Sequence, residues 1–212
     1  NGLIYTPSAY LNPWKTIDLG FTHFSQSTSF TYLAGEKSER AFIANLIFLP
    51  RVAFSARITR PYDNLRPDFQ SGSGRPRNWG IGDRSYGMRV QVLQEKKQQP
   101  ALVIGLNDPL ANLAYFHNVY AVASKQITVR SVHFTGNIGY GVHIEDTRSE
   151  YLEGIFGGIT ATYKGMSVLA EYDSQRLNVG LNYGFRDFIF INLAMIEAQH
   201  FSGNVSFRLQ LN

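Results

Sequence analysis

Histidine and serine are the side chains to examine first, because a serine, a histidine and a third polar group together can hydrolyse or transfer lipid groups. In SVHFT, His133 occupies alternate positions with Ser131 and Thr135, and Glu171 is another polar residue of predicted inward direction. No GxSxG-like element accompanies them. A lone histidine among small polar residues is more typical of a polar filler. We therefore expect no catalytic residue and no enzyme, with a lipid-modifying enzyme as the less favoured alternative.

The sequence contains few motifs that are typical of a metal or cofactor site. The five histidines stand without HxH or HExxH spacing, and the absence of cysteine removes thiolate ligands. The glycine-rich GNIGYG (136–141) does not open a predicted helix, so no helix N-terminus is there to hold a phosphate. The sequence predicts neither a cofactor nor a metal site, while His143, Glu145 and Asp146 leave an opportunistic cation site in a loop as an alternative.

Single charges occur at strand positions that alternation places on one polar face. They are Asp18, Arg57, Arg89, Lys125, Glu171, Asp173 and Arg208. If the sheet closes on itself, the first strand lies beside the last, and Asp18 and Arg208 become partners across that seam. Arg57, Arg89 and Glu171 are expected to form a second cluster at mid-depth. We favour a salt-bridged structural network over a selectivity ring around a pore.

The longest predicted connection, 61–83, interleaves basic and aromatic residues. A connection of this length is usually functional or disordered, and arginine suits phosphate and carboxylate groups. It therefore offers a docking surface for anionic glycan, lipopolysaccharide or a partner protein, the alternative being a plain external loop. The residues concerned are Tyr62, Arg66, Phe69, Arg75, Arg77 and Trp79.

The elements that must position these residues are strands, because alternation of apolar and polar residues recurs along nearly the whole chain. At the end of the chain, NVSFRLQLN places Val205, Phe207, Leu209 and Leu211 on one face. The opposite faces are rich in Gly, Ser, Thr and Asn, which suits a hydrated barrel lumen. The predicted strands are 16–26, 40–49, 52–60, 84–95, 100–108, 118–126, 128–138, 154–163, 166–173, 177–184, 188–198 and 201–211.

Loop length alternates with strand parity. Connections after even-numbered strands are short, with one of them expected at Ile127, whereas those at 27–39, 61–83, 109–117 and 139–153 are long. Up-and-down transmembrane barrels show this alternation, with short periplasmic turns and longer external loops. A tyrosine girdle at the membrane interfaces is expected from residues near predicted strand ends, namely Tyr86, Tyr120, Tyr140, Tyr163 and Tyr183.

Composition narrows the class. Only 17% of the 212 residues are charged, and no run of about 20 apolar residues exists, which excludes a helical membrane protein. A formal net charge of +4 is too small to indicate a nucleic-acid partner. Because the chain begins with Asn1 rather than Met, we expect a mature protein whose signal peptide has been removed.

Five segments follow one another along the chain: GLIYTPSA (2–9), GDRSYGMRVQVLQEKKQQPALVIGLNDP (82–109), YAVASKQ (120–126), GIFGGI (154–159) and AEYD (170–173). In this order they resemble the YjbH-type outer-membrane β-barrel proteins of exopolysaccharide biosynthesis. The resemblance implies an outer-membrane barrel of a Gram-negative bacterium and a link to polysaccharide export, with no chemistry attached.

The sequence thus predicts an all-β fold, a single up-and-down antiparallel transmembrane β-barrel of about twelve strands over 16–212, preceded by a periplasmic segment or partial plug at 1–15. The favoured function is a non-enzymatic accessory or structural subunit of a cell-envelope assembly. A narrow channel for small solutes is the alternative, and a soluble carbohydrate-binding sandwich remains open. Expected partners are outer-membrane lipid or lipopolysaccharide, other envelope proteins and anionic polysaccharide, with no nucleic acid.

Overall fold

The computed structural model describes residues 4–24, 39–61, 83–109, 117–143 and 151–211, which form twelve strands. Within these residues, no helix is long and apolar enough to cross a membrane. The strands are β1 Thr16–Phe24, β2 Glu39–Leu49, β3 Val52–Pro61, β4 Asp83–Leu93, β5 Ala101–Asn107, β6 Asn118–Val129, β7 Val132–Val142, β8 Gly154–Tyr163, β9 Met166–Tyr172, β10 Leu177–Phe185, β11 Ile189–Ile196 and β12 His200–Gln210.

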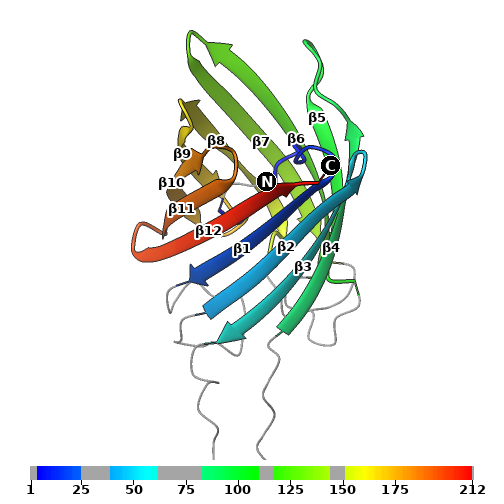
Figure 1. Ribbon diagram of the computed structural model, residues 1–212, viewed down its shortest axis with the longest axis vertical. Helices are drawn as coiled ribbons and strands as arrows, with labels where there is room; N and C mark the ends of the chain where they lie inside the picture. Colours follow the sequence, from blue (N-terminus) through cyan, green and yellow to red (C-terminus); the bar gives the residue numbers. More distant parts are fainter. Residues whose placement is uncertain (1–3, 25–38, 62–82, 110–116, 144–150, 212) are drawn as a thin grey trace, which may run out of the picture.

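Every strand pairs antiparallel with its sequence neighbours, and β1 pairs with β12, so the sheet closes into a barrel (Figure 1). This confirms the predicted up-and-down barrel of twelve strands. The tight connections β2–β3, β4–β5, β6–β7, β8–β9 and β10–β11 share one end, called the turn end below. The opposite end, where β1 leads to β2 and β3 to β4, is called the loop end. At the turn end, Lys164 and Gly165 both have positive φ, as a two-residue hairpin of matching twist requires.

The outward face of the barrel is apolar over its whole circumference. Leu177, Ile159 and Ile138 are 72%, 68% and 65% exposed, whereas a soluble protein rarely leaves so many large apolar side chains uncovered on one continuous surface. Val205, Phe207 and the other apolar residues of β12 belong to this face. The apolar side of the C-terminal strand NVSFRLQLN therefore faces outward, as a membrane-spanning barrel requires.

The predicted boundary between strands 118–126 and 128–138 is wrong, because the turn between β6 and β7 lies further along the chain. The sequence predicts strands at 118–126 and 128–138, but β6 continues to Val129 and β7 extends from Val132 to Val142. The chain reverses at Arg130, where φ is 55°, because Ile127 pairs with Phe134 as an ordinary ladder position. Consequently GNIGYG lies in β7 rather than at the start of a long loop.

The faces of β6 are also opposite to the prediction. Tyr120 is buried on the inner side and Lys125 falls on the outer side, since the inward set is Asn118, Tyr120, Val122 and Ser124. A shift of one residue reverses every side chain of a strand, so both errors have one origin. The inward tyrosine fits because its ring occupies the space in which a Cβ on Gly105 of β5 would lie.

Aromatic residues lie near both ends of the outward face. Tyr86 and Tyr140 lie near the loop end, and Tyr163 and Tyr183 near the turn end, each 44–58% exposed. Four of the five predicted girdle tyrosines therefore point outward, and Tyr120 is the exception. Their positions match the interfacial belts of membrane proteins.

Candidate functional site

The lumen of the barrel contains the N-terminal segment, here defined as residues 4–13 and named the inner segment. It precedes β1, which begins at the turn end, and it reaches Glu171 near the loop end of β9. Tyr5 and Ala9 are buried, and both belong to apolar clusters that include wall residues. The segment therefore runs through much of the depth of the barrel rather than lying outside its mouth.

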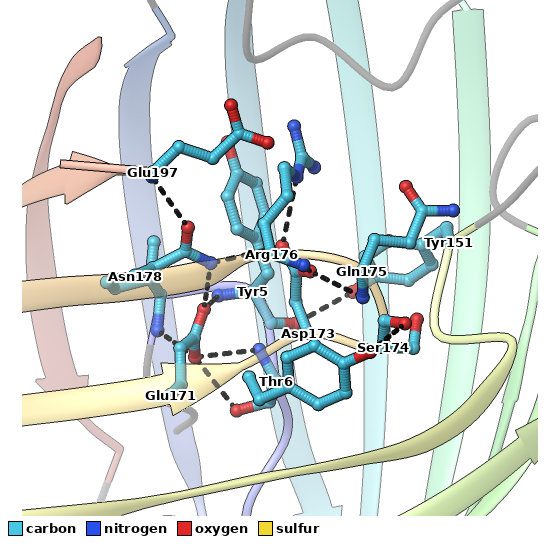
Figure 2. Close-up of polar contacts among 12 residues, drawn as sticks. Tyr5, Thr6, Tyr151, Glu171, Asp173, Ser174, Gln175, Arg176, Asn178 and Glu197 are labelled. Atoms are coloured by element: carbon cyan, nitrogen blue, oxygen red, sulfur yellow. Dashed lines mark hydrogen bonds and ion pairs between the residues drawn. The ribbon is translucent and has the colours of Figure 1, made fainter. Parts of the chain in front are cut away.

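Glu171 holds the first residues of the inner segment. Its carboxylate accepts hydrogen bonds from the backbone N–H groups of Ile4, Tyr5 and Thr6 at 2.9, 2.8 and 3.2 Å, and from Thr6 Oγ1 at 2.8 Å (Figure 2). Asn178 Nδ2 adds a bond of 3.2 Å from the neighbouring strand β10. A carboxylate that is only 2% exposed requires such donors, because a buried charge without them is costly.

A second attachment lies deeper in the lumen. Ala9 N–H donates to Ser124 Oγ at 2.7 Å, and Gln91 Nε2 donates to the Ala9 carbonyl at 2.8 Å. Ala9 also packs into an apolar cluster with Val103, Val122 and other buried side chains of β5, β6 and β8. The inner segment is thus fixed both by hydrogen bonds and by an apolar sector of the lumen wall.

The third attachment is at the turn end, where the Tyr10 hydroxyl donates to Glu95, the carboxylate that also pairs with Lys125 Nζ at 3.1 Å. Burial, together with the hydrogen bond to Glu95 and its charge, raises the pKa of Tyr10. Burial alone would raise the pKa of Glu95, but the hydrogen bonds from Tyr10 and Lys125 outweigh it, and the pKa of Glu95 is lowered. The phenol therefore keeps its proton and the carboxylate stays ionised at neutral pH.

Asp173 organises the β9–β10 turn at the loop end. Its carboxylate accepts from the backbone N–H groups of Gln175 and Arg176, from Asn178 Nδ2, and lies 3.4 Å from Arg176 Nε (Figure 2). The Arg176 guanidinium in turn lies over the ring of Tyr5, 5.4 Å from its centroid. Asp173 therefore supports the inner segment indirectly, by fixing the residue that covers Tyr5.

At the seam of the barrel, the register pairs Asp18 with Arg208. Arg208 Nε lies 2.9 Å from Asp18 Oδ1, which is the contact expected from closure, and the guanidinium also covers the Phe190 ring at 4.3 Å. Asn12 of the inner segment donates to the other Asp18 oxygen. One carboxylate thus connects the closing strands to the end of the inner segment.

The other charged positions depart from the expected network. Among the described residues, no arginine pairs with Glu171, so the expected cluster of Glu171 with Arg57 and Arg89 does not form; its carboxylate instead takes its donors from the inner segment and Asn178. Arg57 and Arg89 both line the lumen, and Arg57 Nε donates to Thr59 at 3.0 Å. Lys125 is a correction: it lies at the rim, where its ammonium contacts turn carbonyls and Glu95.

The remaining candidates lie apart from one another or outside the described residues. His133 lies at the turn end, 2.9 Å from Thr128 Oγ1, whereas Glu171 lies near the loop end, so they form no catalytic pair. His143 contacts Glu153 at 3.8 Å, and in the described part of the chain no three His, Asp or Glu side chains gather as metal ligands. Outside the described residues lie Glu145, Asp146, Tyr62, Arg66, Phe69, Arg75, Arg77 and Trp79.

A cavity of about 660 Å³ remains between the inner segment and the wall. Its lining mixes apolar side chains with many polar ones. Asn182, Asn192 and Asn204 come from three adjacent strands, and hydroxyl side chains such as Thr22 and Ser167 extend the polar surface. The side of the lumen formed by β8–β12 and β1, which carries these amide and hydroxyl side chains, is called the polar sector below; Leu169, Phe190 and Ala194 of the same side also line the cavity.

Of the residues that contact or support the inner segment, the sequence predicts Asp18, Glu171 and Asp173 as inward charges and misses Gln91, Glu95 and Ser124. Tyr5, Thr6 and Tyr10 precede the first predicted strand, so alternation carries no information about them, and Glu95 is the last residue of the predicted strand 84–95. One signal was present: β6 carries apolar residues on both faces, including Val122 on the inner one. Apolar residues inside a barrel indicate that something apolar packs against them.

These features define a closed antiparallel barrel with an apolar outer belt and an occupied, partly polar lumen, the architecture of outer-membrane barrels. The chain belongs to the family described as exopolysaccharide biosynthesis protein YbjH, whose model matches residues 1–149. This confirms the family indicated by the segments 2–9 and 82–109. No curated protein matches the sequence.

Solved structures of similar shape are also outer-membrane proteins. The KdgM porin matches with a TM-score of 0.52 and 9% identity over 93% of this chain and 99% of that one. The KdgM porin in complex with disordered oligogalacturonate gives 0.49 and 8% over 93% and 99%. An outer membrane channel from Pseudomonas putida F1 gives 0.43 and 11% over 94% and 97%. At 9% identity, the likeness to the KdgM porin establishes the fold alone.

Proposed function

We propose that this barrel is a non-enzymatic accessory or structural subunit of a cell-envelope assembly linked to polysaccharide export. The turn end and the start of β1 face the periplasm, and the loop end faces outward, as in other barrels with short periplasmic turns. Residues 1–15 act as a partial plug. The family, described by exopolysaccharide biosynthesis, supports the link to polysaccharide.

The observation that carries this proposal is the attachment of the inner segment at three depths. Glu171 holds residues 4–6, Ser124 and Gln91 hold Ala9, and Glu95 holds Tyr10. A wide solute pore gains nothing from such an insertion, whereas a barrel that serves as a fixed component of a larger assembly is stabilised by it. The expected lumen contacts are therefore structural ones.

The direct test is in-cell crosslinking from the loop end. A photo-crosslinking residue placed at Gln175, on the exposed β9–β10 turn, should capture one discrete envelope protein in cells that export polysaccharide. The same residue at Ile159, on the outward lipid face, is the control and should capture none. If neither position captures a partner protein, the result contradicts the accessory function.

The expected docking surface for anionic glycan, lipopolysaccharide or a partner protein belongs to the same proposal. We propose that Arg66, Arg75 and Arg77 supply its charge. Replacing the three by Ser should reduce binding to an anionic polysaccharide, because each arginine can form paired hydrogen bonds with a carboxylate. Unchanged glycan binding and unchanged crosslinking would remove this surface from the account.

A narrow channel for small solutes is the second candidate, and the cavity of about 660 Å³, with its amide, hydroxyl and charged side chains, favours it. Liposome swelling with sugars of increasing size separates the two functions. The accessory function predicts no swelling with any sugar when the inner segment is intact, and size-dependent swelling would favour the channel.

A further inference from the structure

The polar sector of the lumen contains a continuous stripe of side chains on six consecutive strands. The register pairs Thr162 of β8 with Ser167, Ser167 with Asn182, Asn182 with Asn192, Asn192 with Asn204, and Asn204 with Thr22 of β1. All six residues line the cavity. They are named the amide–hydroxyl stripe below.

Hydrogen bonds connect most neighbours along the stripe. Thr162 and Ser167 hydroxyls lie 2.9 Å apart, Asn182 Nδ2 donates to Asn192 Oδ1, and Asn192 Nδ2 donates to Asn204 Oδ1 at 3.0 Å. Asn204 Nδ2 then donates to Thr22 Oγ1 at 2.8 Å. A primary amide has two N–H donors and an oxygen with two lone pairs. The Asn192 amide, which donates once and accepts once within the stripe, therefore keeps one donor and one acceptor for a ligand in the cavity.

The stripe runs obliquely along the barrel axis, from the turn end towards the loop end. Thr162 is one residue from the turn end of β8, whereas Thr22 is two residues from the loop end of β1. Tilted strands cause this climb, because a path at right angles to the strands advances along the barrel axis. Five strand steps of about 4.8 Å make a path of roughly 24 Å, and a strand tilt of about 40° turns it into an axial rise of roughly 15 Å. A ligand that engages the whole stripe must therefore be a chain.

The chemistry of the stripe selects the type of chain. Amides and hydroxyls both donate and accept, and none of the six side chains carries a charge. A sugar hydroxyl also donates and accepts, so a linear saccharide can satisfy successive positions without any compensating charge. The charged residues that line the same cavity, Asp18, Arg57, Arg89 and Arg208, all lie outside the stripe. The Arg208 guanidinium contacts Asp18 and Phe190, and Arg57 Nε donates to Thr59.

We infer that the amide–hydroxyl stripe is a binding track for a linear, uncharged, hydroxyl-rich glycan segment that lies in the cavity beside the inner segment. This inference rests on the proposed link to polysaccharide export and names the ligand class for the lumen. The inner segment forms the opposite wall of the track, with Thr6 and Tyr10 among the lining residues.

The test is calorimetric titration of the full chain in detergent with maltooligosaccharides of one to seven glucose units. Affinity should rise with chain length, because longer chains reach more positions of the stripe, and glucose alone should show no binding. Replacing Asn192 or Asn204 with Leu, which has a similar shape, should weaken binding of the longest probe about tenfold, the effect of losing a typical hydrogen bond or two. Asn45→Leu is the matched control, since Asn45 lines the same cavity from β2 outside the stripe, and should change affinity less than twofold.

Several results would overturn the inference. They are the absence of binding for every probe, equal affinity for glucose and the longest chain, and wild-type affinity in both stripe variants. Heat-modifiable gel migration shows whether each variant is folded, and Thr162→Val replaces any Asn variant that is not. Crosslinking at Gln175 is measured on the wild type and on the same variants. If the wild type forms no crosslink, the accessory function is refuted. If crosslinking occurs but saccharide binding is absent, only the binding track is refuted.

Discussion

Replacing Glu171 with Gln should release the inner segment while leaving the barrel closed. The carboxylate accepts four hydrogen bonds from residues 4–6. Hydrogen bonds to a charged group contribute about 1.5–3 kcal/mol and neutral ones about 0.5–1.5 kcal/mol. Loss of the charge therefore weakens each by about 1 kcal/mol, and because contributions in one network are not additive, we expect about 3 kcal/mol in total. This corresponds to a roughly hundredfold increase in the released population.

The assay uses the absence of cysteine from the chain. Ser8→Cys introduces a single thiol at a position that is 7% exposed inside the lumen, so a bulky maleimide reagent reacts when the segment is released. We expect the labelling rate to rise about a hundredfold in the Glu171→Gln background, in line with the population. Glu197→Gln is the matched control, because the Glu197 side chain lies on the exposed β11–β12 turn and only its backbone N–H contacts Asn178.

Two results would refute the reasoning. If Glu171→Gln labels within a factor of two of the parent, the carboxylate does not hold the segment. If Glu197→Gln labels equally fast, the effect arises from general destabilisation at the loop end. Strand pairing is checked in parallel by heat-modifiable migration, which both variants should retain.

Three further predictions concern the seam, the wall and the rim. A double-mutant cycle with Asp18→Asn and Arg208→Gln should give a coupling of about 1–2 kcal/mol in urea unfolding, as expected for a partly buried pair; a coupling near zero would mean that the pair does not contribute to closure. Gly139→Ala should destabilise the barrel by about 1–3 kcal/mol, because the added Cβ meets the Phe156 ring and the Ala121 carbonyl. Gly136→Ala on the same strand is the control and should be tolerated, because its added Cβ meets no other atom. Equal stability of the two variants would refute the packing argument. Carboxyl NMR should give Glu95 a pKa below 4.5. Because the folded pKa is depressed, the stability difference between wild type and Tyr10→Phe should be full above pH 4.5 and disappear as the pH falls below it, whereas a pKa at or above 4.5 would contradict the Tyr10–Glu95–Lys125 contact.

Much of the barrel could be predicted because its two rules are local. Alternation of apolar and polar residues along each strand indicates which side chains face outward. The alternation of short and long connections indicates an up-and-down order of strands. The Asp18–Arg208 contact follows from both, since closure forces the first and last strands together and their tilt sets the register. Nothing beyond the strand pattern was needed for that contact.

The rest depends on contacts that leave no periodic trace. β6 carries small or apolar residues on both faces, so alternation does not decide its direction; the ring of Tyr120 lies inward because Gly105 leaves space for it. The same holds for Glu171, whose donors in the inner segment lie 165 to 167 residues away in the chain. An inward carboxylate could be predicted, but its partners required knowledge of where the inner segment lies.

The central claim is that the inner segment closes the lumen of this outer-membrane barrel, and single-channel recording in planar bilayers tests it most directly. The full chain should be silent, and a variant lacking residues 1–12 should show discrete conductance steps, because the deletion removes most of the segment that fills the lumen beside the cavity. Equal conductance steps in the full chain and in the shortened variant would contradict the claim.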